Sequence, residues 1–293
     1  MNQLEVSTPQ RTKEIIAKHK FSFKKSLGQN FLIDGHVLDQ IVHAANLSKD
    51  KGALEIGPGI GALTQALAQQ AGKVTAIEID RRLIPILAEV FEDQDHVNIV
   101  QGDVLDINLR QLFTDQFSDY KKVSVVANLP YYVTTPILMK LLEEKLPLEN
   151  IVVMIQKEVA QRMSAKPGGK EYGSLSVAVQ YYCTTEIVCI VPGTAFIPQP
   201  NVDSAVIKLT VRDEPAVKVE DEAFFFRVVQ SAFVQRRKTL INNLMMVAGK
   251  EKRPELTALL ESIHIDPIRR GETLSLEEFA TLSIALLAVD WFN

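Results

Sequence analysis

The sequence predicts an α/β protein with a doubly wound, mostly parallel sheet, followed by a smaller, all-helical C-terminal domain. Three observations lead to this prediction. Short apolar stretches alternate with amphipathic helical stretches from residue 52 to 163, a glycine-rich turn follows the first of them, and every periodic segment beyond residue 213 is helical. Strands that alternate with helices pair in parallel and are covered on both faces. We therefore expect two domains, residues 1–212 and 213–293.

Each element is assigned from its hydrophobic period. Before the sheet we expect a basic helix at 11–19, an ordered loop at 23–32 and a helix at 34–45 with Asp34 as its N-cap. The strands lie at 53–56, 74–79, 97–100, 123–127 and 151–155, with helices at 62–71, 81–91, 135–144 and 157–163. The apolar stretch at 174–182 fits a helix or a strand, and we favour a helix. A strand at 186–191, an extended turn at 196–200 and a strand at 202–211 follow, then a linker at 212–219. Helices are expected at 221–235, 237–248, 254–262 and 275–289, the last with a capping box of Ser275 and Glu278.

The composition excludes several classes of protein. The 293 residues include 46% hydrophobic and 23% charged residues, which is ordinary for a globular protein. We find no apolar signal segment at residues 1–10 and no apolar run of membrane-spanning length. Cys183 and Cys189 lie in one strand region and cannot pair, so we expect free thiols and a cytoplasmic location. The histidines and cysteines have no metal-ligand spacing, so we expect no metal.

The charge of the chain is unevenly distributed. The formal net charge is −4, but residues 11–25 and 227–253 each carry a clear excess of Lys and Arg. Two basic stretches on an acidic chain suit a protein that meets a polyanion on one side only. The alternative is two solvated helix faces with no partner.

The glycine-rich turn at 57–61 is typical of nucleotide-binding α/β folds. Its spacing is Gly57-x-Gly59-x-Gly61, one residue shorter than the dinucleotide fingerprint. Glycines let the backbone approach a ligand closely, and the helix N-terminus that follows offers free N–H groups. A tight strand-to-helix turn with no ligand remains the alternative.

Acidic residues lie at the ends of the next two predicted strands, at the edge where such sheets bind ligands. Glu78 is placed to accept hydrogen bonds from the ribose hydroxyls of an adenosine-containing cofactor. Asp103 is placed to accept one from the exocyclic amine of adenine. The alternatives are a surface acid that caps the helix at Arg81 for Glu78, and an Asx turn for Asp103.

The most specific stretch is Asn128-Leu129-Pro130-Tyr131, at the end of the fourth predicted strand. Pro130 fixes its own φ and restricts Leu129 to extended conformations. The Asn128 side-chain oxygen and a nearby backbone carbonyl could hold both hydrogens of an exocyclic amine, and Tyr131 offers a stacking surface for a base. A strand-ending turn with a core tyrosine would not explain why an amide, a proline and an aromatic ring coincide there.

These motifs resemble those of the ribosomal RNA adenine-N6 dimethyltransferases. The Asn128–Tyr131 stretch is similar to their N-[LI]-P-Y motif, and Glu55–Gly61 resembles their S-adenosylmethionine turn. Similarity also covers Ser26–Leu32, Phe196–Ala205 (F-x-P-x-P-x-V-D-S-A) and the basic segment Phe233–Leu240. The resemblance extends in register over about residues 20–245 and is strongest to the small-subunit (16S) members.

The resemblance implies a Rossmann-like class I methyltransferase fold and assigns further residues. It implies that S-adenosylmethionine is bound by Asn30, Leu32, Gly57, Gly59, Glu78, Ile79, Asp103, Val104 and Asn128. It implies that the catalytic residues are Asn128, Leu129, Pro130, Tyr131 and Phe196, where Phe196 stacks the target adenine against Tyr131. The RNA-binding residues are then Lys24, Lys25, Arg236, Arg237 and Lys238.

The activity implied is transfer of methyl groups to N6 of two adjacent adenosines near the 3′ end of 16S rRNA, within an immature small ribosomal subunit. We expect a monomer with no membrane partner. The main alternative is a 23S rRNA adenine dimethyltransferase that confers macrolide resistance, although Leu129 and the long C-terminal helical domain favour the small-subunit enzymes. A non-catalytic assembly factor and a nicotinamide-dependent dehydrogenase are the other classes. The short glycine spacing argues against the dehydrogenase.

Overall fold

The computed structural model describes Val6, residues 8–19, Phe21, Lys24, residues 28–289 and Phe292. The described chain divides into two compact units, residues 1–160 with 186–211 and residues 161–185 with 212–293. Residues 161–185, which were predicted to lie in the first domain, therefore belong with the C-terminal helices. No helix among the described residues is long and apolar enough to cross a membrane.

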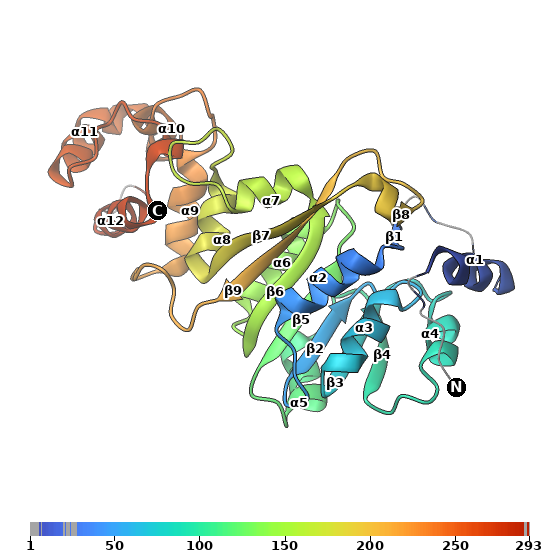
Figure 1. Ribbon diagram of the computed structural model, residues 1–293. Helices are drawn as coiled ribbons and strands as arrows, with labels where there is room; N and C mark the ends of the chain where they lie inside the picture. Colours follow the sequence, from blue (N-terminus) through green and yellow to red (C-terminus); the bar gives the residue numbers. More distant parts are fainter. Residues whose placement is uncertain are drawn as a thin grey trace. The chain divides into compact units, whose positions relative to one another are not determined.

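The first unit contains a seven-stranded sheet in the order β4-β3-β2-β5-β6-β9-β7 (Figure 1). The strands are β2 (Gly52–Ile56), β3 (Lys73–Glu78), β4 (Val97–Gln101), β5 (Val123–Asn128), β6 (Leu148–Gln156), β7 (Cys183–Val191) and β9 (Ser204–Val211). Neighbours from β4 to β6 are parallel, and β9 runs antiparallel to β6. The predicted Rossmann-like α/β fold is confirmed.

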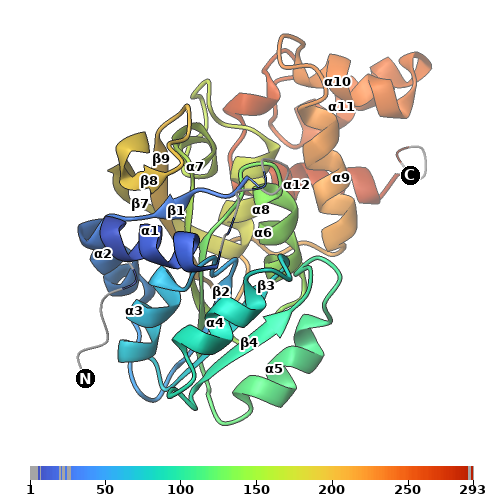
Figure 2. The same cartoon turned by 90° about the vertical axis from the view of Figure 1, so that its right-hand side faces the viewer.

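Helices cover both faces of this sheet. On one face lie α2 (Gly35–Ala45) and α3 (Ala62–Gln70), and on the other α5 (Leu109–Phe117) and α6 (Thr134–Glu143) (Figure 2). Two further helices of this unit are α1 (Pro9–Lys18) and α4 (Ile84–Val90). Leu38, Leu67, Val126 and Val152 belong to one buried cluster that joins α2 and α3 to the sheet. Asp34 accepts hydrogen bonds from the N–H groups of His36 and Val37, which confirms it as the N-cap of α2.

A second, two-stranded sheet joins distant parts of the first unit. Strand β1 (Phe31–Leu32) pairs antiparallel with β8 (Phe196–Ile197), and Leu32 lies opposite Phe196. A short 3-10 helix, η2 (Gly193–Ala195), leads into β8. The sequence predicted a loop and an extended turn at these places, because strands of two residues have no readable period.

The second unit is built from α8 (Ser174–Tyr182), α9 (Glu222–Ala232), α10 (Leu240–Ala248), α11 (Arg253–Ser262) and α12 (Leu276–Leu287); α7 (Lys157–Met163) crosses from the first unit into it. The Tyr181 ring of α8 packs 5.1 Å, centroid to centroid, from that of Phe225 in α9. The predicted capping box of α12 is confirmed, because Ser275 Oγ and the Glu278 carboxylate each accept the other's backbone N–H. Both cysteines are free, as predicted.

Candidate functional site

The glycine turn joins β2 to α3 at the carboxyl edge of the sheet. Gly59 has a φ of +60°, and a Cβ added to it would lie 3.0 Å from the ring of Phe31. Only glycine is accommodated without strain at a left-handed position so close to a ring. The turn therefore brings bare backbone, and the N-terminus of α3 at Ala62, to one wall of a cavity.

Glu78 forms the second wall, at the end of β3. Its side chain is 4% exposed, and its two oxygens accept the N–H groups of Asp80 (2.7 Å) and Gly59 (3.2 Å). Burial raises the pKa of Glu78 to about 7, although these two hydrogen bonds lower it. The hydrogen bond to Gly59 fixes the carboxyl group directly beside the glycine turn.

The segment at Asn30–Leu32 closes the cavity from the N-terminal side. The pairing of β1 with β8 holds Leu32 against Phe196, and both residues line the cavity. Beside them, Gln29 Nε2 donates to Asp80 Oδ2 over 2.9 Å, and the neighbouring Arg82 holds the pKa of the Asp80 carboxyl down at about 2. Two backbone segments far apart in the chain thus meet the strand ends at one place.

Asn128 is the last residue of β5, and one hydrogen bond to the described residues orients its side-chain amide. Its Nδ2 donates to the backbone carbonyl of Asn30 over 2.9 Å. Because the amide nitrogen is committed there, Oδ1 is the end of the amide that is available as an acceptor. Tyr131 is held in turn by its hydroxyl, which lies 2.9 Å from Ser204 Oγ. The amide and the aromatic ring are therefore both fixed before any substrate binds.

The structure brings most of the predicted site residues to this one cavity. Its lining includes Asn30, Leu32, Gly57, Gly59, Glu78, Ile79, Asn128, Leu129, Pro130, Tyr131 and Phe196. Phe196 is only 2% exposed and also belongs to the hydrophobic core, so its face toward the cavity is a small part of its surface.

Asp103 and Val104 are not among the residues that line the cavity. Asp103 Oδ1 accepts the N–H of Leu105 over 2.9 Å, which is the Asx turn that the sequence left open as an alternative. The loop nevertheless begins beside Glu78, because the Gly102 N–H donates to the Glu78 carbonyl over 2.9 Å. Contact of both residues with a cofactor stays a prediction.

Comparison with known proteins decides the family. The family model for ribosomal RNA adenine dimethylases matches residues 20–282. The chain belongs to this family. Two relatives, each named ribosomal RNA small subunit methyltransferase A, are 60% identical over 97% of this chain and 98% of theirs (Bacillus licheniformis) and 59% identical over 97% of both chains (Geobacillus thermodenitrificans).

Two solved structures share the fold of this dimethylase-family chain. A dimethyladenosine transferase from Plasmodium falciparum superposes with a TM-score of 0.74 at 26% identity, covering 88% of this chain and 96% of that one. The 23S rRNA methyltransferase ErmE superposes with a TM-score of 0.67 at 26% identity, covering 87% and 99%. Each superposition covers a larger share of this chain than the first unit occupies.

Glu55 of this dimethylase also lines the cavity, although the sequence predicted no role for it. It is the last residue but one of β2, is 1% exposed, and its Oε2 has no hydrogen-bond partner among the described residues. Burial raises its pKa to about 8, and the charge of Glu78 also raises it. The sequence signal for Glu55 was a lone carboxyl in an otherwise apolar strand.

Glu55 makes stability depend on pH. Its folded-state pKa, about 8, lies above the ordinary value of 4.5, so the folded protein keeps a proton that the unfolded chain loses. Stability is therefore full below about pH 4.5 and falls as the pH rises toward 8. We expect Glu55→Gln to remove the Glu55 part of this loss, on the order of 3 kcal/mol between pH 5.5 and 8.0 at about 1.4 kcal/mol per pKa unit. The smaller part that comes from Glu78, whose pKa is also raised, should remain. Urea unfolding at pH 5.5 and 8.0 measures both parts.

The control for this experiment is Glu92→Gln, which neutralises an exposed carboxylate of the same unit. It should leave the difference in unfolding free energy between the two pH values as in the wild type. Equal pH dependence in the wild type and in Glu55→Gln would contradict the assignment.

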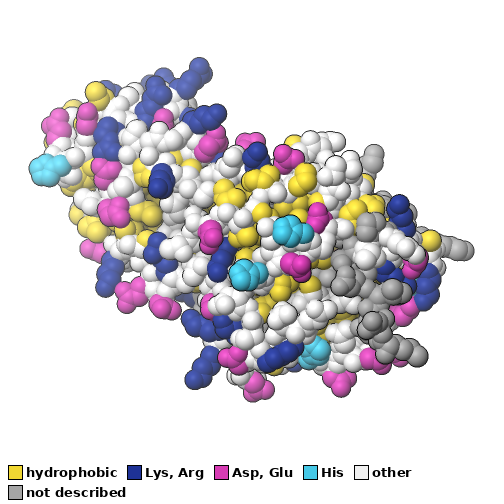
Figure 3. Space-filling view, viewed as in Figure 1, with side chains coloured by type: hydrophobic (Ala, Val, Ile, Leu, Met, Phe, Trp, Pro, Cys, Tyr) yellow, Lys and Arg dark blue, Asp and Glu magenta, His cyan; other side chains and the backbone are white. Residues whose placement is uncertain are grey.

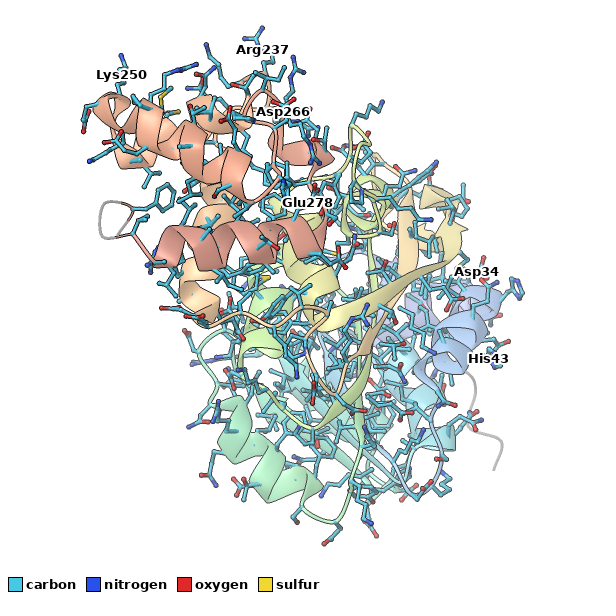
Figure 4. All side chains as sticks on the ribbon, turned by 90° about the vertical axis from the view of Figure 1, so that its left-hand side faces the viewer. Asp34, His43, Arg237, Lys250, Asp266 and Glu278 are labelled. Carbon is cyan, nitrogen blue, oxygen red and sulfur yellow. The ribbon has the colours of Figure 1, made fainter. Side chains whose placement is uncertain are left out.

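The predicted RNA-binding residues fall on both units. Lys24 is exposed, and Lys25 lies outside the described residues. Arg236, Arg237 and Lys238 are exposed in the loop between α9 and α10, because α10 begins at Leu240 and not at 237 as the period suggested. Lys and Arg side chains gather where α10 and α11 lie, and Arg237 and Lys250 point away from the helices (Figures 3 and 4).

A buried amide shapes this basic loop. Asn243 is 1% exposed, and its Nδ2 donates to the carbonyls of Ala232 (2.7 Å) and Gln235 (3.2 Å). Its Oδ1 accepts the N–H of Gln235 over 3.2 Å. The loop backbone is thereby fixed from within while its three cations stay exposed to solvent.

Proposed function

We propose that the protein transfers methyl groups from S-adenosylmethionine to N6 of two adjacent adenosines near the 3′ end of 16S rRNA, two to each, on an immature small ribosomal subunit. Membership of the dimethylase family supports the reaction. Relatives named small subunit methyltransferases, 60% and 59% identical over nearly the whole chain, support the substrate over 23S rRNA. The observation that carries the proposal is the Asn128 amide, whose nitrogen is bound to Asn30 and whose oxygen is left as an acceptor.

The residues present fit the proposed cofactor. The cavity has a wall of bare backbone at Gly57 and Gly59, a buried carboxyl with an unpartnered oxygen at Glu55, and a second carboxyl at Glu78. Bare backbone and carboxyl oxygens suit the carboxylate, amino and ribose groups of an amino-acid nucleoside. When bound, S-adenosylmethionine supplies an electrophilic methyl group.

The chain's own residues then position the acceptor. The target adenine stacks between Tyr131 and Phe196, and the Asn128 Oδ1 and the Leu129 carbonyl accept the two hydrogens of N6. Oriented this way, the N6 lone pair points along the line of attack. Positioning of this kind can lower a barrier by up to roughly 7–11 kcal/mol. No general base is required, since methylation makes the nitrogen acidic and water takes its proton.

The two units take different roles in this proposal. The first holds cofactor and target base, and the second binds the rRNA through Arg236, Arg237 and Lys238. The protein acts as a monomer. No cluster of three or more His, Cys, Asp or Glu side chains in the described part of the chain is placed to bind a metal ion, and the proposed mechanism uses none.

The test is methylation of immature small subunits with labelled S-adenosylmethionine, followed by mapping of the product. We expect label on two neighbouring adenosines near the 3′ end of 16S rRNA. Primer extension on both rRNAs from a deletion strain separates this activity from the alternative. Loss of a modification in 23S rRNA, with 16S rRNA unchanged, would refute the proposal.

Gly59 provides a separate test of the cofactor site. Gly59→Ala is expected to weaken binding of S-adenosylmethionine about tenfold or more, because the new Cβ meets the Phe31 ring in a backbone conformation that costs roughly 1–2 kcal/mol. Isothermal titration measures it. The matched control is Gly35→Ala, where a Cβ meets nothing within 4 Å. Equal affinities for the two variants would place the cofactor elsewhere.

A further inference from the structure

A second hollow adjoins the cofactor cavity in the first unit. We call it the amide groove, and its distinguishing residues are Lys24, Gln156, Gln199, Asn201 and Val202. Its volume is about 480 Å³, within the roughly 300–1,000 Å³ typical of small-molecule pockets. It shares a wall with the cofactor cavity, formed by Gly28, Gln29, Asn30 and Tyr131. The groove therefore opens directly beside the proposed position of the target base.

Gln156 is held next to Tyr131 by the sheet. It is the last residue of β6 and lies opposite Ser204 of β9 in the antiparallel register. Directly opposite residues place their side chains on the same face of a sheet. Ser204 in turn bonds the Tyr131 hydroxyl. Gln156 therefore lies on the same face of the sheet as the residue that bonds the Tyr131 hydroxyl.

The groove offers amides and hardly any charge. The side chains of Gln156, Gln199 and Asn201 make no hydrogen bond to the described residues, so their donors and acceptors are available. Lys24 is the one charged residue in its described lining, which contains no carboxylate. Amide side chains pair with the donor and acceptor edge of adenine, whereas a phosphate site would need several cations.

We infer that the amide groove is a subsite for the base of the nucleotide next to the target adenosine. The inference rests on the proposed function. While one adenosine is extruded to Tyr131 and Phe196, its neighbour on the same strand lies one phosphate away, and Lys24 at the rim meets that phosphate. Gln156 and Asn201 read the neighbouring adenine. The enzyme then recognises the base next to the target adenosine as well as the target itself.

The experiment uses the full chain and small subunits whose 16S rRNA carries either adenosine or uridine at the position next to a single target adenosine. The variant is Gln156→Met with Asn201→Leu, which keeps side-chain size and removes both amides. Its matched control is Gln70→Ala, an exposed amide of α3. The readouts are kcat/KM for methyl incorporation at the retained target adenosine, mapped separately from the neighbouring adenosine because that neighbour is itself a proposed acceptor, and affinity for S-adenosylmethionine by titration.

We expect the wild type and Gln70→Ala to prefer the adenosine neighbour by about tenfold. The double variant should lose this preference to within about twofold, with unchanged affinity for S-adenosylmethionine. A wild type indifferent to the neighbour would overturn the inference, as would a double variant that keeps the preference. So would an equal fall on both substrates, since the groove would then serve the target base itself. Absence of methylation by the wild type would refute the proposed function, and the subsite with it.

Discussion

Asn128→Ala is expected to lower the rate of methyl transfer by about 10²–10³-fold, the usual cost of removing one preorganised polar group at a reacting centre. The alanine leaves N6 without its side-chain acceptor, so the lone pair is no longer aimed. The variant also loses the 2.9 Å bond from Nδ2 to the Asn30 carbonyl. A several-fold loss of cofactor affinity should therefore accompany the loss of rate. Single-turnover methylation and titration with S-adenosylmethionine separate the two effects.

The matched control is Asn98→Ala. It removes an amide from β4 of the same sheet, where Asn98 bonds Gln116 and does not line the cavity. This variant should methylate at close to the wild-type rate. Full methyl transfer by Asn128→Ala with unchanged cofactor affinity would show that Asn128 does not orient the acceptor.

Replacing Arg236, Arg237 and Lys238 together by alanine is expected to weaken binding to the immature small subunit by roughly tenfold for each phosphate interaction that is removed, at about 0.1 M salt. Each such removal also lowers the slope of log affinity against log salt by about 0.7–0.9. The three side chains are exposed and the loop backbone is held by Asn243, so the fold should persist. Filter binding over a salt series measures both quantities.

A control of equal charge change is the triple variant Arg110→Ala, Lys121→Ala, Lys218→Ala, whose parent side chains are exposed elsewhere on the chain. It should keep the wild-type slope and affinity. Affinity for S-adenosylmethionine should be unaffected in both triple variants. If both triple variants weaken RNA binding equally, the loss comes from the change in net charge and not from the loop between α9 and α10.

The fold was largely predictable because the hydrophobic periods of its helices and strands are strong. One helix of the first unit was nevertheless missed. Helix α5 (Leu109–Phe117) has a buried stripe of Leu109, Leu112, Phe113 and Phe117, and its N-cap is Asn108. These signals were present in the sequence and could have been used. In contrast, nothing local marks 161–185 as part of the second unit, since that follows from packing of Tyr181 against Phe225.

The site residues that follow strands could be predicted from position, because parallel strands end at a common edge. The interactions between them could not. The orientation of Asn128 depends on a carbonyl at Asn30, far away in the sequence. Phe196 reaches the cavity because β8 pairs with β1, and that pairing has no sequence signature. Glu55 could be recognised as an acid in an apolar strand, but the absence of a partner for its Oε2 among the described residues could not be predicted.

The pairing of β1 with β8 also decides when the site can first exist. Leu32 is among the early residues to leave the ribosome, whereas its partner Phe196 follows only after β2 to β7 have been made. A nascent chain that ends before Phe196 therefore lacks one of the two stacking rings and leaves the edge of β1 unpaired. The cavity is completed only near the end of synthesis of the first unit, so a nascent chain that ends before Phe196 does not contain the whole of it.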